Sequence, residues 1–166
     1  MPSAAGAEEL LSRVAELVRD IGPPVTALSG GVDSSVVAVV ADRVHGSRAL
    51  AVTGVSPSLA PSELEAVTEL ARGLGLRHRL LETGEMELPA YRENGPDRCY
   101  HCKSDLFSRL LELARDEGCE AVLSGENKDD LGDYRPGMQA GAEMGVRRPL
   151  LEAGLDKAQV RLLAAH

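Results

Sequence analysis

Aromatic residues are scarce in this chain: its 166 residues include one phenylalanine, three tyrosines and no tryptophan. Proteins that bind single-stranded nucleic acids stack the bases on several aromatic side chains, so we do not expect such a surface here. The formal net charge of −8 also argues against a broad phosphate-binding surface, although a local basic patch stays open. The composition therefore disfavours a nucleic acid partner.

Long apolar runs are lacking as well. No stretch is long enough to span a bilayer, and Met1–Glu9 has neither the basic start nor the apolar core of a secretory signal. We therefore expect a cytoplasmic protein with no membrane partner. In that compartment the three cysteines are expected to be reduced or bound to metal.

The apolar residues form short runs that alternate with helical patterns. We predict strands at 25–28, 49–55, 78–81 and 121–123, and helices at 10–21, from the loop after the first strand to 44, at 62–74 and at 103–116. Residues 82–98 are expected to form a loop. This alternation predicts an α/β fold, with a parallel sheet flanked by helices, and the length suits one domain covering 1–166.

Two pairs of residues predict helix starts. Ser62 with Glu65 has the spacing of a capping box for the helix at 62–74, and Asp156 with Gln159 suits the N-cap and N3 positions of a last helix.

The segment Ser29–Ser35 separates two apolar runs, Val25–Leu28 and Val36–Ala41. Between a strand and a helix, Gly30 and Gly31 would let backbone N–H groups approach phosphate oxygens, next to the unpaired donors of the helix end. A tight structural turn is the simpler alternative, but it does not require the three serines and the aspartate of this segment. No lysine follows the glycines as in a Walker A loop, and the Gly-x-Gly-x-x-Gly pattern is absent.

A second candidate is the Cys-x-x-Cys pair formed by Cys99 and Cys102. Such a pair can chelate a metal, form a redox disulfide or be incidental, and a complete zinc or iron–sulfur site needs further ligands. His101 lies between the two and could point away. Cys119 precedes a predicted strand, where a cysteine is usually a buried apolar residue.

The segment 124–137 is rich in aspartate and glycine. A solvated loop is the simple interpretation. At a predicted strand end facing Ser29–Ser35, however, carboxylates such as Asp130 become candidates for Mg²⁺, and Gly125 could allow a nucleotide to approach closely. Arg147 and Arg148 could bind an anion, but we expect them to be exposed arginines without a function.

Ser29–Ser35 resembles the Ser-Gly-Gly-x-Asp-Ser PP-loop of ATP pyrophosphatases, in which ATP transfers AMP and pyrophosphate leaves. Together with Val52–Ser58, Pro96–Lys103, Asp129–Gly137 and Pro149–Leu155, it resembles the LarE family of ATP-dependent sacrificial sulfur transferases. That family adenylates a carboxylate of a pyridinium dicarboxylate mononucleotide and then introduces sulfur, on the route to a nickel-pincer cofactor. Its members continue beyond this chain's end with a segment that carries a sulfur-donating or cluster-completing cysteine. The chain could therefore be a fragment or end naturally.

The resemblance implies a PP-loop ATP pyrophosphatase fold, similar to adenine nucleotide alpha hydrolases, with ATP, Mg²⁺ and a pyridinium carboxylate nucleotide as partners. Asp33 and Ser34 would be catalytic, Asp33 and Asp130 would bind Mg²⁺, and Cys99 and Cys102 would bind a 4Fe–4S cluster. The residues expected to bind ATP are Ser29, Gly30, Gly31, Val32, Asp33, Ser34, Ser35, Val52, Thr53 and Gly125. A PP-loop tRNA thiolase and a non-catalytic ATP-binding module are the alternatives, and a homo-oligomer stays open.

Overall fold

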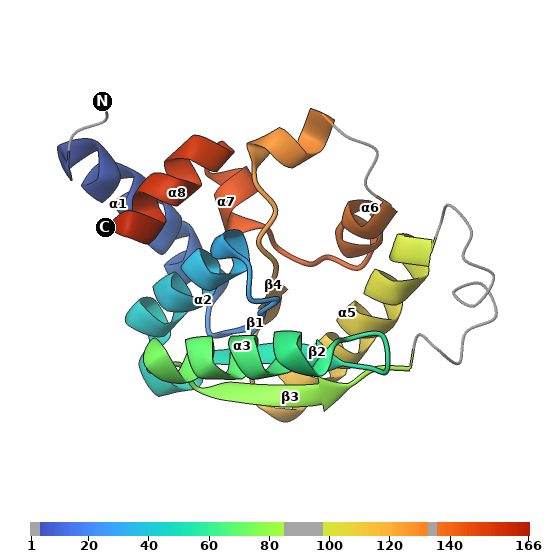
Figure 1. Ribbon diagram of the computed structural model, residues 1–166. Helices are drawn as coiled ribbons and strands as arrows, with labels where there is room; N and C mark the ends of the chain where they lie inside the picture. Colours follow the sequence, from blue (N-terminus) through green and yellow to red (C-terminus); the bar gives the residue numbers. More distant parts are fainter. Residues whose placement is uncertain (1–3, 85–97, 133–135) are drawn as a thin grey trace.

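The computed structural model of the chain describes residues 4–84, 98–132 and 136–166 (Figure 1). Strands alternate with helices along most of this length. The elements are, in order, α1 (Ala4–Ile21), β1 (Pro24–Ala27), α2 (Val32–His45), the 3₁₀ helix η1 (Gly46–Arg48), β2 (Leu50–Val55), α3 (Pro61–Gly73), β3 (His78–Glu82), α5 (Arg98–Asp116), β4 (Ala121–Leu123), the 3₁₀ helix η3 (Lys128–Gly132), α6 (Pro136–Glu143), α7 (Pro149–Glu152) and α8 (Lys157–Ala165).

The described strands form one parallel sheet in the order β3-β2-β1-β4. In the central strand β1, Val25 lies opposite Leu50 of β2 and Val122 of β4. The carboxyl ends of parallel neighbours meet at one edge, so the segments after β1, β2 and β4 are brought together although they are far apart in sequence. The predicted parallel α/β sheet is confirmed.

Helices pack on both faces of this sheet. On one face, Val25, Val52 and Val122 form a buried cluster with Phe107 and Leu110 of α5. On the other, residues of α2 are buried against α1, α7 and α8. Figure 1 shows α5 and α6 next to each other on one side of the molecule, away from α1 and α8. Within the described part, no helix is both long and apolar enough to cross a membrane.

The helix α3 starts differently from the prediction. It begins at Pro61, and the N–H of Ala60 donates to Glu63 Oε2 (3.1 Å), so Ala60 and Glu63 occupy the capping positions. The prediction of a capping box at Ser62 and Glu65 was wrong. Proline favours the first helical position because its φ angle already suits a helix and it has no N–H to satisfy, and this sets the start of α3. The capping pair predicted at Asp156 and Gln159 is confirmed.

The helix α5 also starts earlier than predicted, at Arg98 instead of Lys103. Its first turns are polar and lack an apolar period, but they pack against α6, where the Tyr100 hydroxyl donates to Glu143 Oε2 (2.5 Å). The Cys-x-x-Cys pair therefore lies in the first turns of α5, whereas the predicted helix began only after it. Most of the predicted loop, residues 85–97, lies outside the described residues.

Candidate functional site

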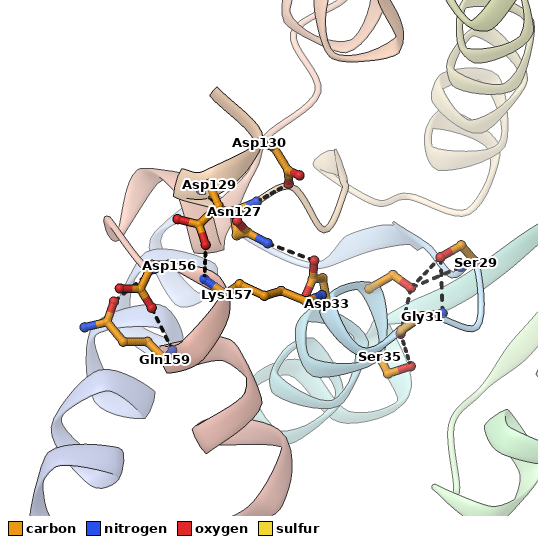
Figure 2. Close-up of polar contacts among 11 residues, drawn as sticks. Ser29, Gly31, Asp33, Ser35, Asn127, Asp129, Asp130, Asp156, Lys157 and Gln159 are labelled. Carbon is orange, nitrogen blue, oxygen red and sulfur yellow. Dashed lines mark hydrogen bonds and ion pairs between the residues drawn. The ribbon is translucent and has the colours of Figure 1, made fainter. Parts of the chain in front are cut away.

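The turn between β1 and α2 is held together by its own hydroxyl groups (Figure 2). The Ser29 N–H donates to Ser34 Oγ (3.1 Å), the two serine hydroxyls lie 3.0 Å apart, and the Ser35 hydroxyl donates to Gly31 O (2.7 Å). Gly30 has φ +92°, a conformation that glycine adopts without a steric penalty. Gly31 is the N-cap of α2 and provides no side-chain cap. The turn is therefore a compact, locally bonded loop at a helix N-terminus, an arrangement suited to anions.

Asp33, in the first turn of α2, is held from two distant parts of the chain. Its Oδ1 accepts from Lys157 Nζ (2.8 Å), at the start of α8, and its Oδ2 accepts from Asn127 Nδ2 (2.9 Å), after β4. Asn127 is buried, whereas the side chains of Asp33 and Lys157 are 20% and 36% exposed. Neither Asn127 nor Lys157 was among the site residues predicted from the sequence.

The segment after β4 is folded around Asn127 (Figure 2). The Asn127 N–H donates to Asp130 Oδ2 (2.9 Å), and Asn127 Oδ1 accepts from the Asp129 N–H (2.8 Å). Asp129 Oδ2 in turn accepts from the Lys157 N–H (3.1 Å). The candidate Asp130 therefore has a structural hydrogen bond, and the same segment anchors the start of α8.

Gly125 allows this segment to pack directly on the loop. A Cβ atom at position 125 would lie 2.7 Å from Ser34 N and 3.0 Å from the Asp33 carbonyl carbon. The sequence predicts that Gly125 lets a nucleotide approach closely, and that stays a prediction; the close approach in the structure is that of the protein's own backbone. A larger residue at position 125 would require the first turn of α2 to shift.

A cleft of about 600 Å³ opens beside the loop at the carboxyl edge of the sheet. Its walls come from the loop, strand β2, the segment after β4, and helices α5, α6 and α8. Of the predicted residues, the cleft is lined by Ser29, Gly31, Val32, Asp33, Ser34, Val52, Thr53, Cys102, Gly125 and Asp130. Gly30 and Ser35 belong to the same loop but do not line the cleft. Glu126, which accepts a hydrogen bond from Ser124, and Lys103 also line it.

In the middle of β2, which runs from Leu50 to Val55, polar groups of the two predicted residues are already partnered within the protein. The Val52 carbonyl accepts from the Leu28 N–H (2.9 Å), and the Thr53 hydroxyl donates to Leu28 O (2.7 Å). Thr53 Oγ1 also lies 2.8 Å from His78 Nε2. Because the single Thr53 hydroxyl proton is directed at Leu28, His78 Nε2 is the donor in that contact. Burial lowers the pKa of His78.

The cysteines do not converge in the described part of the chain. Cys102 is half-buried in the cleft wall, and the side chain of Cys99 lies outside the described residues. Cys119 precedes β4, at the opposite edge of the sheet, and is partly buried against the α5 side of the core, where burial raises the pKa of its thiol. Among the described residues, no group of three or more histidine, cysteine, aspartate or glutamate side chains is placed to hold a metal ion.

The two arginines near the end have structural partners. Arg147 Nη2 and Nε donate to Glu152 Oε1 (2.8 and 3.0 Å), and the Arg148 N–H donates to Glu152 Oε2 (2.9 Å). Burial by itself would raise the pKa of Glu152, but these contacts outweigh it and the pKa lies below its usual value. The arginines therefore fix the turn at α7.

The sequence pattern of the asparagine synthase family matches residues 6–133, which include the loop after β1. The chain belongs to this family. It is 45% identical over 157 residues to an uncharacterised protein of Synechocystis (95% of this chain and 59% of that protein). It is 35% identical over 148 residues to the pyridinium-3,5-bisthiocarboxylic acid mononucleotide synthase of Lactiplantibacillus plantarum (89% of this chain and 54% of that protein). The resemblance to the LarE family is thus confirmed, and the chain spans little more than half the length of these relatives.

Solved structures support the same fold. The chain superimposes on a glutamine-dependent NAD⁺ synthetase of Acinetobacter baumannii with a TM-score of 0.75 and 19% identity (99% of this chain and 34% of that one). For an NMN synthetase of Francisella tularensis the TM-score is 0.74 at 20% identity (96% of this chain and 69% of that one). At these identities the likeness concerns the fold, and it confirms the predicted PP-loop fold.

Proposed function

We propose that this chain is the ATP-binding domain of a carboxylate-adenylating enzyme whose product is then converted to a thiocarboxylate by sulfur transfer. The observation that carries the proposal is the loop Ser29–Ser35, self-bonded at the N-terminus of α2 and open to a cleft of about 600 Å³. A backbone cradle of this kind suits the two phosphates that leave as pyrophosphate.

The cleft can accommodate a nucleotide. Small-molecule sites in proteins typically have volumes of roughly 300–1,000 Å³, and this cleft falls within that range. The loop Ser29–Ser35 would hold the β- and γ-phosphates, with Gly125 letting the segment after β4 close behind it. Val52 and Thr53, which line the cleft from the middle of β2, are our candidates for contacts with adenine.

The residues present also fit Mg²⁺. Asp33 and Asp130 both line the cleft, and Mg²⁺ is usually bound through one or two carboxylates, phosphate oxygens and water. When bound, Mg²⁺ would neutralise negative charge on the phosphates. Asp33 would hold the ion, and Ser34, whose hydroxyl contacts Ser29, would help to fix the loop around the leaving group.

In the proposed reaction a substrate carboxylate oxygen attacks the α-phosphorus of ATP, and the bond from that phosphorus to the bridging oxygen breaks. The acyl adenylate then reacts at its carbonyl carbon with a sulfur nucleophile, and AMP leaves. The likeness to the L. plantarum synthase supports a pyridinium carboxylate nucleotide as substrate. We assign no sulfur donor.

The cysteine pair fits a 4Fe–4S cluster only in part. Cys99 and Cys102 would supply two thiolates, and such clusters are usually held by four. Within the part of the chain that the structure describes, no group of three or more histidine, cysteine, aspartate or glutamate side chains is placed to hold a metal ion. The side chain of Cys99 is not among those residues, so we assign no further ligands. No step of the proposed reaction uses a cluster.

The test is to incubate the 166-residue chain with ATP, Mg²⁺ and the pyridinium dicarboxylate mononucleotide, and to measure pyrophosphate. Release that requires the dicarboxylate supports adenylation, and Asp33→Asn should reduce it strongly. Asp20→Asn, at an exposed position near the end of α1, is the matched control and should leave it unchanged.

ATP binding without pyrophosphate release would instead indicate a non-catalytic binding module, and absence of ATP binding would overturn the proposal. Mass spectrometry after turnover would identify a donor cysteine by its conversion to dehydroalanine. Intact cysteines would show that this chain is not the donor.

A further inference from the structure

Asp33 carries a charge partner that its proposed role in Mg²⁺ binding does not require. Lys157 Nζ lies 2.8 Å from Asp33 Oδ1, and Asn127 Nδ2 lies 2.9 Å from Oδ2 (Figure 2). Both carboxylate oxygens therefore accept a hydrogen bond within the protein, one of them from a full positive charge. A cation that binds Asp33 must compete with this ammonium group.

The backbone of Lys157 is fixed at this place by several contacts. Its N–H donates to Asp129 Oδ2 (3.1 Å), and the preceding residue, Asp156, exchanges hydrogen bonds with Gln159 in the capping box of α8. The Lys128 N–H donates to Leu155 O (2.7 Å), which ties the same turn to the segment after β4. The lysine stem therefore starts from a defined point beside Asp33.

The ammonium group itself is free to exchange partners. Its side chain is 36% exposed and lines the cleft, and four rotatable carbons separate the charge from the fixed backbone. An ion pair at such a partly exposed site is weak, so a divalent cation can displace the lysine without unfolding α8.

We propose that Lys157 acts as a built-in competitor of Mg²⁺ at Asp33, so that metal binding requires the ammonium group to leave the carboxylate. This inference rests on the proposed function, since it takes Asp33 as the carboxylate that binds Mg²⁺. In the metal-free protein Lys157 neutralises Asp33, and on metal binding it moves into the adjoining cleft. Lys157 is thus a positioning residue that sets the metal concentration at which the site fills.

The test is direct titration of the nucleotide-free chain with Mn²⁺. Binding is monitored by electron paramagnetic resonance, as the loss of the signal of free Mn²⁺. Lys157→Met keeps the apolar stem and removes the charge, so Mn²⁺ should bind roughly three to ten times more tightly, as expected for a screened charge within a few ångströms. Lys157→Arg keeps the charge and should stay within about twofold of the wild type. The gain should shrink at high ionic strength, because salt screens the repulsion.

Two controls separate competition at Asp33 from a general effect of charge or folding. Lys128→Met makes the same change in net charge at an exposed position in η3 and should leave Mn²⁺ affinity unchanged. Adding Asp33→Asn to Lys157→Met should abolish the gain. The circular dichroism spectrum of each variant verifies that it is folded.

The inference is overturned if Lys157→Met binds Mn²⁺ no more tightly than the wild type, if Lys128→Met gains as much, or if no variant binds Mn²⁺. A parallel titration with ATP tests the proposed function separately. If the chain binds ATP but Lys157→Met shows no gain in Mn²⁺ affinity, only this inference is refuted. If the chain does not bind ATP, the proposed function is refuted.

Discussion

Replacing Gly125 by alanine should disturb the candidate site directly. The added Cβ would lie 2.7 Å from Ser34 N, 2.9 Å from Ser34 Cα and 3.0 Å from the Asp33 carbonyl carbon. These are backbone atoms in the first turn of α2, which cannot rotate away as a flexible side chain can. Gly125 does not have a positive φ angle, so the effect of the substitution would be steric and would not include backbone strain.

The expected loss of stability follows from the backbone atoms of α2 that must move. Inserting a methyl group into a well-packed region typically costs about 1–3 kcal/mol. For a domain of this size each kcal/mol lowers Tm by roughly 2–4 °C, so we expect a decrease of about 2–12 °C. The steric clash is relieved only if the loop Ser29–Ser35 shifts, so the affinity for ATP should also fall. The expected decrease is about tenfold for each 1.4 kcal/mol of lost loop contacts.

Urea unfolding and titration with a fluorescent ATP analogue measure the two effects. Gly73→Ala is the matched control: Gly73 ends α3 and its φ angle is not positive. Apart from its chain neighbours and the backbone of its own helix, nothing would lie within 4 Å of the new Cβ. That variant should be neutral or more stable by up to about 1 kcal/mol, and should bind the analogue normally. If Gly125→Ala had the same urea midpoint and affinity as the wild type, the steric argument would be refuted.

Three further predictions concern the structure around the cleft. Thr53→Val removes the hydroxyl that pairs with Leu28 O and His78 Nε2, and should cost about 1–3 kcal/mol in urea unfolding; a loss well below that range would contradict it. Because burial lowers the pKa of His78 below 6.5 in the folded state, the unfolded chain binds this proton more readily. The contribution of neutral His78 to the free energy of unfolding should therefore be complete above pH 6.5 and decline as the pH falls below it. His78→Gln should flatten this part of the pH profile of stability. Phe107→Ala removes a side chain that is 1% exposed and should lower the free energy of unfolding by about 3–5 kcal/mol; a value near zero would show that the core repacks.

Features encoded by adjacent residues could be predicted from the sequence. The run of apolar residues at 25–28 predicted β1, found at Pro24–Ala27, and the run at 49–55 predicted β2, found at Leu50–Val55. The loop Ser29–Ser35 was recognised because its glycines, serines and aspartate are contiguous. Its hydrogen bonds are also local, so its compact form is already implied by those seven residues.

Features that depend on partners remote in sequence could not be predicted. Lys157 pairs with Asp33 across 124 residues, and Asn127 reaches the same carboxylate across 94. Lys157 lies in an ordinary helix start, where no local pattern distinguishes it from an exposed lysine. The early start of α5 at Arg98 has the same origin, because its polar first turns are stabilised by packing against α6 and not by an apolar period.

The order of the strands explains why these partners meet. β4 is adjacent to β1 in the sheet, so the segment after β4 lies against the loop after β1, and Asn127 reaches Asp33. That segment also holds the start of α8 through Asp129, which places Lys157 on the other oxygen. The shape of the loop therefore depends on local contacts, whereas the charge balance of Asp33 depends on the tertiary fold. Substitutions at Asn127 or Lys157 should consequently alter how the site responds to cations while leaving the hydrogen bonds within the loop intact.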